Sequence, residues 1–293
     1  MNIYEENNSV VVENLEHFEP EHIFECGQCF RWEKEEDESY TIVAFERILN
    51  IKKDKNKIYF NNTNVNEFHS IWYEYFDLHR DYGKIKDKLR KIDTYLEKAV
   101  NFGSGIRILN QDPWEILISF IISANNRIPM IKKSIENLSR LYGKEIGEYK
   151  GKKYYAFPTI EKMNSLSVEE IEKCGTGYRS TYIKDTAFIV ENKQTNIYNL
   201  KNLNTDMCKS ELMMFCGVGP KVADCIMLFS MQKYDTFPVD VWVKRVMEEF
   251  YLDEEMSLNK IREYGINKFK DISGFAQQYL FYYARELGIG RKR

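Results

Sequence analysis

The spacing of apolar residues changes near residue 100, and this change most limits the folds open to the chain. Residues 40–52 are apolar at roughly every second position, a polar DKNK follows, and residues 58–60 are apolar again, which predicts a strand, a turn and a strand. Residues 81–100 instead have the spacing of a helix. Residues 1–104 are therefore expected to form an antiparallel sheet with flanking helices.

Beyond the glycine-rich residues 103–105 the pattern is almost wholly helical. Asp112 followed by Pro113 is typical of a helix N-cap with proline in the first turn. The apolar residues 116–122 then predict a helix buried on most sides. No repeat or linker separates the two regions, so we expect them to share an interface. The predicted class is α+β: an N-terminal antiparallel sheet domain (1–104) and an all-α body (105–293).

The formal net charge of −3 is unevenly distributed. Residues 1–50 carry a net charge of −10, which leaves +7 on the other 243 residues. The low overall charge therefore does not exclude a nucleic-acid partner.

Other classes of protein are excluded more firmly. No apolar run approaches the roughly 20 residues of a membrane span, and the first residues lack the order of a signal peptide. The six cysteines are scattered, and the Cys26–Cys29 pair has no partner pair, so we interpret them as ordinary thiols in a reduced compartment. With many Lys, Ile and Asn residues, the composition favours the cytoplasm of a prokaryote.

Residues 209–226 carry the clearest signal for binding. An apolar helix is predicted to end at Phe215 and Cys216, Gly217 and Gly219 permit a sharp turn, and Pro220 opens a second helix. Amides at the start of that helix point outward with the positive end of its dipole, an arrangement that suits a phosphate. A plain junction between two helices is the alternative.

Lys221 lies in the first turn of the second helix. A cation there opposes the helix dipole, so the position favours the neutral amine, which is a nucleophile and can form a Schiff base. A surface lysine that contacts phosphate is the alternative. Asp240 follows nineteen residues later in FPVDVW and precedes another helix, which it at least caps.

The segment GVGPKVADCIMLFS…FPVDVWVKR resembles the helix-hairpin-helix/Gly-Pro-Asp superfamily of base-excision DNA glycosylases, and within it the 8-oxoguanine DNA glycosylases. The resemblance extends over nearly the whole chain. Further motifs that carry it are CGQCFRW (26–32), QDP (111–113), SANN (123–126), GYR (177–179) and GFAQ (274–277) with Phe281.

The resemblance implies a base-flipping enzyme. Lys221 would attack the deoxyribose C1′, and Asp240 would stabilise the cationic sugar or assist lysine deprotonation. The Gly27 carbonyl would accept the N7 hydrogen that distinguishes 8-oxoguanine from guanine, and Gln277 would bond the Watson–Crick edge. Three further residues would complete the base pocket: Cys225 and Phe281 as a sandwich, and Phe229 as an extension of the wall.

Other matching residues would face the duplex. Asn125 and Tyr178 would fill the space left by the flipped base, and Arg179 would contact the opposite cytosine. The family commonly has a second cytosine-reading arginine where this chain has Met130, and methionine cannot donate a hydrogen bond. We therefore expect a relaxed opposite-base preference, unless Arg127 substitutes.

The hairpin and a tryptophan are expected to hold the DNA backbone. The residues assigned to phosphate are Gly217, Gly219, Val222 and Trp242, the last of which replaces a usual histidine. A structural cation is expected at the carbonyls of Met213, Phe215 and Val218. No cysteine follows Cys225, so no iron–sulfur cluster is expected, and no cofactor is required.

The expected function is therefore a bifunctional glycosylase and abasic-site lyase. Its partner would be duplex DNA containing 8-oxoguanine, with no membrane, and the protein would act as a monomer. Two alternatives remain: a glycosylase for oxidised pyrimidines, and a non-catalytic helix-hairpin-helix DNA-binding protein.

Overall fold

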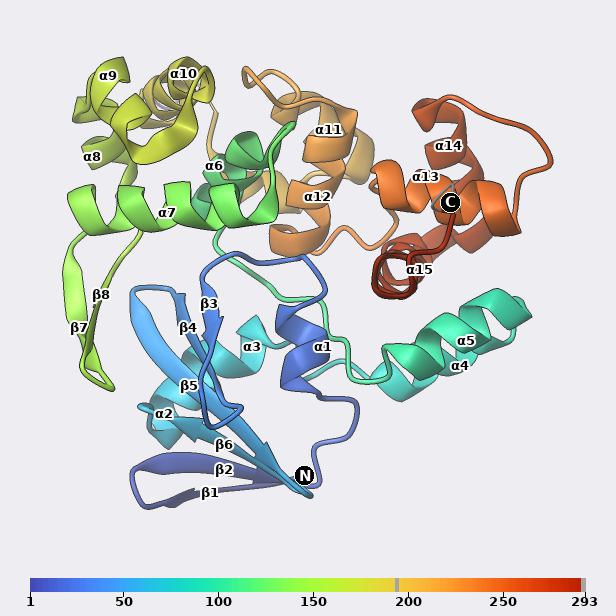
Figure 1. Ribbon diagram of the computed structural model, residues 1–293, viewed down its shortest axis with the longest axis horizontal. Helices are drawn as coiled ribbons and strands as arrows, with labels where there is room; N and C mark the ends of the chain where they lie inside the picture. Colours follow the sequence, from blue (N-terminus) through green and yellow to red (C-terminus); the bar gives the residue numbers. More distant parts are fainter. Residues whose placement is uncertain (193–194, 291–293) are drawn as a thin grey trace.

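The computed structural model describes residues 1–192 and 195–290, and it places an antiparallel sheet beside a larger helical body (Figure 1). The predicted α+β class is confirmed. Within the described ranges, no helix has the length and apolar character that crossing a bilayer would require.

Six strands form one antiparallel sheet in the order β1-β2-β6-β5-β4-β3, as labelled in Figure 1. Their bounds are β1 (Asn2–Glu6), β2 (Ser9–Glu13), β3 (Trp32–Lys34), β4 (Tyr40–Ala44), β5 (Arg47–Asp54) and β6 (Lys57–Asn61). The single strand predicted over residues 40–52 is wrong, because β4 and β5 are joined by a turn at Phe45 and Glu46, with φ of 49° and 58°. Apolar residues alternate on both sides of this turn, so the hydrophobic period does not reveal it.

Short helical segments cover the sheet and complete its own core. They are α1 (Pro20–Phe24), α2 (Val65–Glu67), a π-helical turn (Phe68–Trp72) and α3 (Tyr73–Tyr75). The buried rings of Phe18, Phe60 and Phe76 lie 5.3–5.8 Å apart between their centroids. Such tilted and edge-to-face aromatic contacts add to the energy of burial.

Helices α4 (Tyr82–Arg90) and α5 (Thr94–Phe102) replace the one helix expected over residues 81–100. The Asp93 side chain accepts hydrogen bonds from the Tyr95 and Leu96 amides at 3.1 and 2.9 Å, and so starts α5 as a new helix. Both helices contribute buried residues to the core of the helical body, where α5 packs against α15 (Ser273–Leu287). The boundary at residue 104 stays a prediction.

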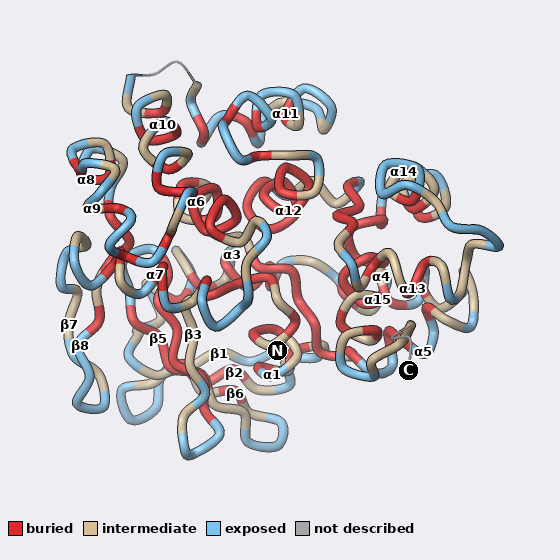
Figure 2. Tube along the Cα trace, turned by 45° about the horizontal axis from the view of Figure 1, so that its top comes forward, coloured by how far each residue is buried: buried red, intermediate tan, exposed pale blue. Residues whose placement is uncertain are grey.

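The helical body is built around α6 (Pro113–Ser123), which is buried on nearly all sides as predicted (Figure 2). The Asp112 carboxylate accepts a 2.9 Å hydrogen bond from the Glu115 amide, which confirms the predicted N-cap. The other α-helices that the structure describes in this body are α7 (Ile128–Tyr142), α8 (Ile160–Ser165), α9 (Val168–Ile171), α10 (Arg179–Glu191), α11 (Thr205–Leu212), α12 (Pro220–Ser230), α13 (Val241–Phe250) and α14 (Leu258–Phe269).

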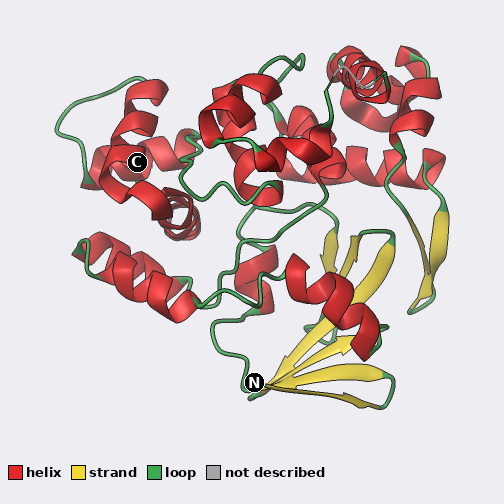
Figure 3. Ribbon diagram, turned by 180° about the vertical axis from the view of Figure 1, so that it is seen from behind, coloured by secondary structure: helices red, strands yellow, loops and turns green. Residues whose placement is uncertain are grey.

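A hairpin of β7 (Glu145–Tyr149) and β8 (Lys152–Tyr155) reaches from the helical body to the first sheet (Figure 3). Tyr154 packs with Val43 and Ile48 of that sheet. Lys152 forms a 2.7 Å ion pair with Glu33 on the same side. The hairpin therefore ties the two regions together.

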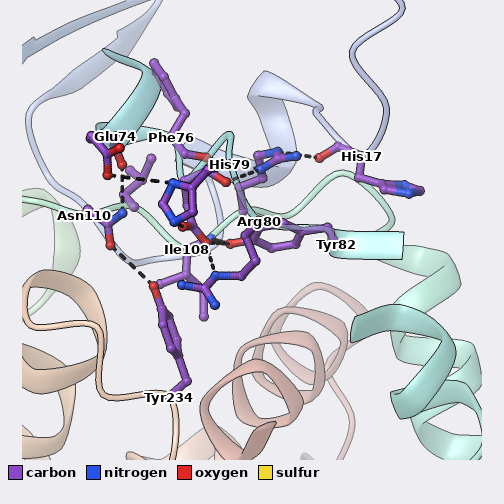
Figure 4. A network of polar contacts seen from close by, with 12 residues as sticks. His17, Glu74, Phe76, His79, Arg80, Tyr82, Ile108, Asn110 and Tyr234 are labelled. Carbon is purple, nitrogen blue, oxygen red and sulfur yellow. Dashed lines mark hydrogen bonds and ion pairs between the residues drawn. The ribbon is translucent and has the colours of Figure 1, made fainter. Parts of the chain in front are cut away.

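A polar network forms a second contact between the two regions (Figure 4). The buried Asp77 carboxylate accepts hydrogen bonds from Arg80 Nε at 2.6 Å and from the Tyr82 hydroxyl at 3.0 Å. The Arg80 guanidinium carbon lies 4.3 Å from the ring centroid of Tyr234 in the helical body. The expected shared interface is confirmed.

Candidate active site

The hairpin between α11 and α12 contains Gly217, a position that only glycine can occupy without strain. Its φ is +81°, and an added Cβ would lie 2.7 Å from the ring of Tyr182. Helix α11 ends at Leu212, so the prediction that it reaches Phe215 and Cys216 is wrong. The chain uses residues 213–219 for the turn.

Helix α12 begins as predicted, with Gly219 at the N-cap and Pro220 in the first turn. No side chain caps it, so its first amides keep their capacity to bind an anion. Met214 at the tip of the hairpin is 77% exposed. The hairpin is thus an exposed turn that leads into a helix start without a side-chain cap.

A cavity of about 50 Å³ lies beside the start of α12. Seven of the residues singled out in the sequence line it: Gly27, Lys221, Cys225, Phe229, Asp240, Gln277 and Phe281. Phe120, Pro238 and Gln278 also line it and were not predicted. Residues more than 250 positions apart in the chain therefore meet at one site.

Lys221 and Cys225 stand one helical turn apart on α12. The Lys221 Nζ lies over the face of the Phe120 ring, 5.4 Å from its centroid. Burial raises the pKa of the Cys225 thiol to about 11, although the nearby Lys221 opposes the rise. The Cys225 thiol is therefore neutral at physiological pH and contributes a polarisable sulfur to the cavity wall.

Asp240 is the N-cap of α13, as the sequence indicated. Its Oδ1 accepts hydrogen bonds from the amides of Trp242 at 2.9 Å and Val243 at 2.8 Å. Both bonds end on one oxygen, so Oδ2 takes no part in the cap. One carboxylate can therefore start a helix and still present charge to the cavity.

The Gly27 loop approaches the cavity from the sheet region. Gly27 has φ of +82°, and a Cβ placed on it would lie 3.1 Å from the Phe281 ring. The buried Gln28 side chain fixes this loop: its Nε2 donates to the carbonyls of Ile23 and Arg107, and its Oε1 accepts from the Leu109 amide, each at 2.8 Å. The backbone at Gly27 is therefore rigid and close to the cavity.

Gln277 is 5% exposed, and its Oε1 has no hydrogen-bond partner among the residues described. A buried acceptor left without a donor costs about 1–3 kcal/mol. Because Gln277 lines the cavity, a ligand with a hydrogen-bond donor would remove this cost. Phe281 lies one turn further along α15.

Two of the residues expected to face the duplex are prominent at the surface. Asn125 follows α6 in the left-handed region, with φ of +49°, and is exposed. Tyr178 is 56% exposed at the start of α10. Met130 is 46% exposed in the first turn of α7, and Arg127 just before it is also exposed.

Arg179 differs from its expected placement, because it is 7% exposed and bonded to the protein's own backbone. Its Nε and Nη2 donate to the Ala124 carbonyl at 2.9 and 2.6 Å, and Nη2 also donates to the Asn125 carbonyl at 2.9 Å. Its Nη1 donates to the Thr176 carbonyl at 3.2 Å. Four of the five N–H groups of a guanidinium are thus engaged, so a bidentate contact with cytosine is incompatible with this arrangement.

The residues assigned to phosphate binding differ in the groups that they can present to DNA. The side chain of Val222 is buried, so only its amide can face the DNA. Trp242 is half-buried, and the Arg245 guanidinium carbon lies 4.9 Å from its ring centroid. Among the residues that the structure describes, no group of three His, Cys, Asp or Glu side chains could hold a metal ion.

Comparison with known proteins gives two family matches that divide the chain. Residues 10–117 match the N-terminal domain of 8-oxoguanine DNA glycosylases, and residues 118–271 match the HhH-GPD superfamily of base excision DNA repair proteins.

Similar proteins include a solved structure and two curated relatives. The structure is an 8-oxoguanine glycosylase/lyase from Clostridium acetobutylicum, in complex with double-stranded DNA containing cytosine opposite 8-oxoguanine. It is 54% identical with a TM-score of 0.96, and the match covers 99% of both chains. A probable N-glycosylase/DNA lyase from Methanothermobacter thermautotrophicus is 30% identical over 73% of this chain and 72% of its own length. The N-glycosylase/DNA lyase OGG1 of Arabidopsis thaliana is 26% identical over 88% of this chain and 75% of its own.

Proposed function

Because the chain belongs to the HhH-GPD superfamily of base excision DNA repair proteins, we propose that it excises 8-oxoguanine from duplex DNA and then cleaves the strand at the abasic site. The observation that carries this proposal is the cavity that joins Lys221, Asp240, Gln277 and the Gly27 loop. A nucleophile, a carboxylate and two base-reading groups meet there in one place.

Recognition requires the damaged nucleotide to leave the duplex, because the reacting atom is inaccessible in the base stack. In the cavity, the Gly27 carbonyl accepts the N7 hydrogen that guanine lacks, and Gln277 Oε1 gains the donor it lacks. Cys225 and Phe281 enclose the two faces of the base. A cavity of about 50 Å³ holds only a few water molecules, so the lining side chains move apart when a purine enters.

The reaction begins when the side-chain nitrogen of Lys221 attacks C1′ of the flipped nucleotide. The bond from C1′ to N9 breaks, and its electron pair leaves with the base. Asp240 stabilises the positive charge that develops on the sugar, or accepts the proton of the lysine ammonium. Opening of the sugar ring then gives a Schiff base with Lys221.

Strand cleavage follows from the Schiff base. The iminium withdraws electrons from C2′, a proton leaves C2′, and the 3′ phosphate departs with the electron pair of its C–O bond. This β-elimination needs no external cofactor. The same lysine therefore serves both the glycosylase and the lyase step.

The hairpin holds the DNA backbone through amides and not through sequence-reading side chains. The carbonyls of Met213, Phe215 and Val218 are hard oxygen ligands that suit a structural cation. The Phe215 carbonyl already accepts a 3.1 Å hydrogen bond from the Val218 amide, and its second lone pair remains for an ion. A cation there would bridge the hairpin to a phosphate.

The opposite-base preference is proposed to be relaxed. Met130 has no donor for cytosine, and Arg179 retains a single N–H beyond its contacts with the backbone. The duplex is then held by shape and insertion, through Asn125 and Tyr178, more than by reading the opposite base.

Borohydride trapping tests the function directly. Duplexes containing 8-oxoguanine, thymine glycol or an abasic site are incubated with the enzyme and reduced. We expect a covalent adduct with the 8-oxoguanine and abasic duplexes, which Lys221→Gln abolishes while still binding DNA. An adduct with thymine glycol but not with 8-oxoguanine would identify a pyrimidine glycosylase, and no adduct at all would identify a non-catalytic DNA-binding protein.

A further inference from the structure

Three side chains from outside the Gly27 loop bind the carbonyls on either side of Gly27. Arg285 Nη2 donates to the Glu25 carbonyl, and Gln278 Nε2 donates to the Cys26 carbonyl at 2.8 Å. Gln111 Nε2 donates to the Gln28 carbonyl at 2.9 Å.

Of the four consecutive carbonyls from Glu25 to Gln28, only that of Gly27 accepts no hydrogen bond from any residue that the structure describes. This is also the carbonyl assigned to the N7 hydrogen of the lesion. Its neighbours are satisfied, so the loop cannot rotate without breaking bonds to buried groups. The Gly27 carbonyl, the one free acceptor among these four in the described part of the chain, therefore keeps a fixed orientation.

Arg285 lies where the loop meets the base-stacking ring. Its guanidinium carbon is 5.3 Å from the ring centroid of Phe281, and a Cβ on Gly27 would lie 3.1 Å from its Nη1. The Arg285 side chain is 17% exposed. The Arg285 guanidinium therefore contacts both the Gly27 loop and the Phe281 ring, although Arg285 itself does not line the cavity.

Helix α15 thus carries two sets of residues. Gln277 and Phe281 line the cavity, as does Gln278. Gln278 and Arg285, on the same helix, bind the loop that supplies the opposing carbonyl. The Gly27 carbonyl is thereby held at a fixed place relative to the backbone of α15, which discrimination by one hydrogen atom demands, while the side chains that line the cavity can still move apart to admit the base.

We propose that Arg285 and Gln278 are positioning residues for lesion recognition, which hold the Gly27 carbonyl at a fixed place relative to helix α15, the helix that carries Gln277 and Phe281. The inference rests on the proposed function. It concerns only the step that reads the base, because an abasic site presents no base to the Gly27 carbonyl.

The test compares two rates in each variant: single-turnover excision of 8-oxoguanine, and β-elimination at a preformed abasic site. We expect Arg285→Met to lower excision about tenfold, the equivalent of one hydrogen bond, and to leave β-elimination within about twofold of wild type. Gln278→Met is expected to behave in the same way. Arg285→Lys, which still donates to Glu25 but has no planar group against Phe281, should recover part of the loss.

Glu286→Gln is the matched control. Glu286 pairs with Arg285 at 2.8 Å on the exposed side, so this variant removes the ion pair and keeps the contacts of Arg285 with the Glu25 carbonyl and with the Phe281 ring. We expect it to excise 8-oxoguanine at the wild-type rate. An equal loss in Glu286→Gln and Arg285→Met would show that surface charge, not positioning, is responsible.

A second measurement separates positioning from general damage to the fold. In a Lys221→Gln background, which prevents turnover, the affinities for 8-oxoguanine and guanine duplexes are compared. Arg285→Met is expected to reduce the ratio of the two affinities. Equal weakening of both, or a parallel loss of excision and β-elimination, would overturn the proposal.

Different experimental results would overturn the positioning role and the proposed function. Wild-type enzyme that excises no 8-oxoguanine overturns both. Wild-type enzyme that excises it, with Arg285→Met and Gln278→Met equally active, overturns only the positioning role.

Discussion

The carboxylate of Asp240 and the amide of Val243 are joined by a 2.8 Å hydrogen bond that starts helix α13 and uses only Oδ1. The structural and the chemical roles of Asp240 are thus divided between its two oxygens. A substitution that keeps one oxygen acceptor and removes the charge can separate them.

Asp240→Asn is expected to keep the helix and lose the chemistry. Asparagine caps helices about as well as aspartate, so thermal unfolding should change little. Loss of the charge should lower 8-oxoguanine excision by about 100-fold or more. Asp240→Ala, which also removes the cap, should in addition cost about 1 kcal/mol of stability. Excision by Asp240→Asn at the wild-type rate would refute the catalytic role.

Arg179→Met is expected to weaken binding to every lesion duplex alike. The variant leaves the carbonyls of Ala124, Asn125 and Thr176 without their donor, so the loop that presents Asn125 loses its support. Affinities are measured in a Lys221→Gln background with C, A, G or T opposite 8-oxoguanine. A loss confined to cytosine would instead support base reading by Arg179, and Arg127→Met serves as the control for charge in the same loop.

Met130→Arg is expected to create a preference for cytosine. Met130 is exposed beside the predicted duplex face, so an arginine there can extend without a clash in the core. A guanidinium can donate to O2 and N3 of cytosine, and such pairs contribute about 1–3 kcal/mol of discrimination. The ratio of excision rates opposite C and A should rise about fivefold or more, whereas Met130→Leu should leave it unchanged. Strict cytosine dependence in the wild type would contradict the expectation.

Gly217→Ala and Gly219→Ala form a matched pair within one hairpin. Gly217 has φ of +81° and no room for a Cβ beside Tyr182, whereas Gly219 has φ of −88° and nothing within 4 Å of the Cβ position. Gly217→Ala should destabilise the protein by about 1–3 kcal/mol, and Gly219→Ala by about 0.5 kcal/mol at most. Denaturant unfolding measures both. Equal effects would show that the left-handed turn does not limit stability.

Sequence patterns that span only a few consecutive residues predicted the local structure correctly. The Asp112 cap, Pro220 at the start of α12 and the spacing from Lys221 to Cys225 all depend on a few consecutive residues. The turn at Phe45 and the end of α11 were not predictable in the same way, because apolar periodicity continues through both positions.

Only the resemblance to the DNA glycosylases could predict that the cavity residues lie together in the fold. Periodicity places Lys221 and Cys225 on one face of a helix, but it cannot bring Gly27 and Phe281 beside them, since those contacts join distant segments. Arg285 and Gln278 escaped prediction for a related reason. Their partners are backbone carbonyls, which leave no mark on the sequence at Glu25 and Cys26.

Glu115 predicts a pH dependence of stability. Burial raises the pKa of its carboxyl from 4.5 to about 7, although the Arg31 guanidinium 3.5 Å away favours the ionised form. Between these values the unfolded chain is ionised at this residue and the folded chain is protonated, so unfolding releases a proton and stability falls as pH rises. Below pH 4.5 both states are protonated, and above pH 7 both are ionised, so the loss is confined to that window.

Glu115→Gln should remove this dependence. Its free energy of unfolding relative to wild type is expected to rise steadily from pH 4.5 to about 7 and then to stay constant, because glutamine does not titrate. Denaturant unfolding at a series of pH values measures the difference. Glu136→Gln, at an exposed position on α7, is the control for the replacement of one glutamate outside the core. A difference that is independent of pH would mean that Glu115 is ionised in the folded protein and that its pairing with Arg31 outweighs its burial.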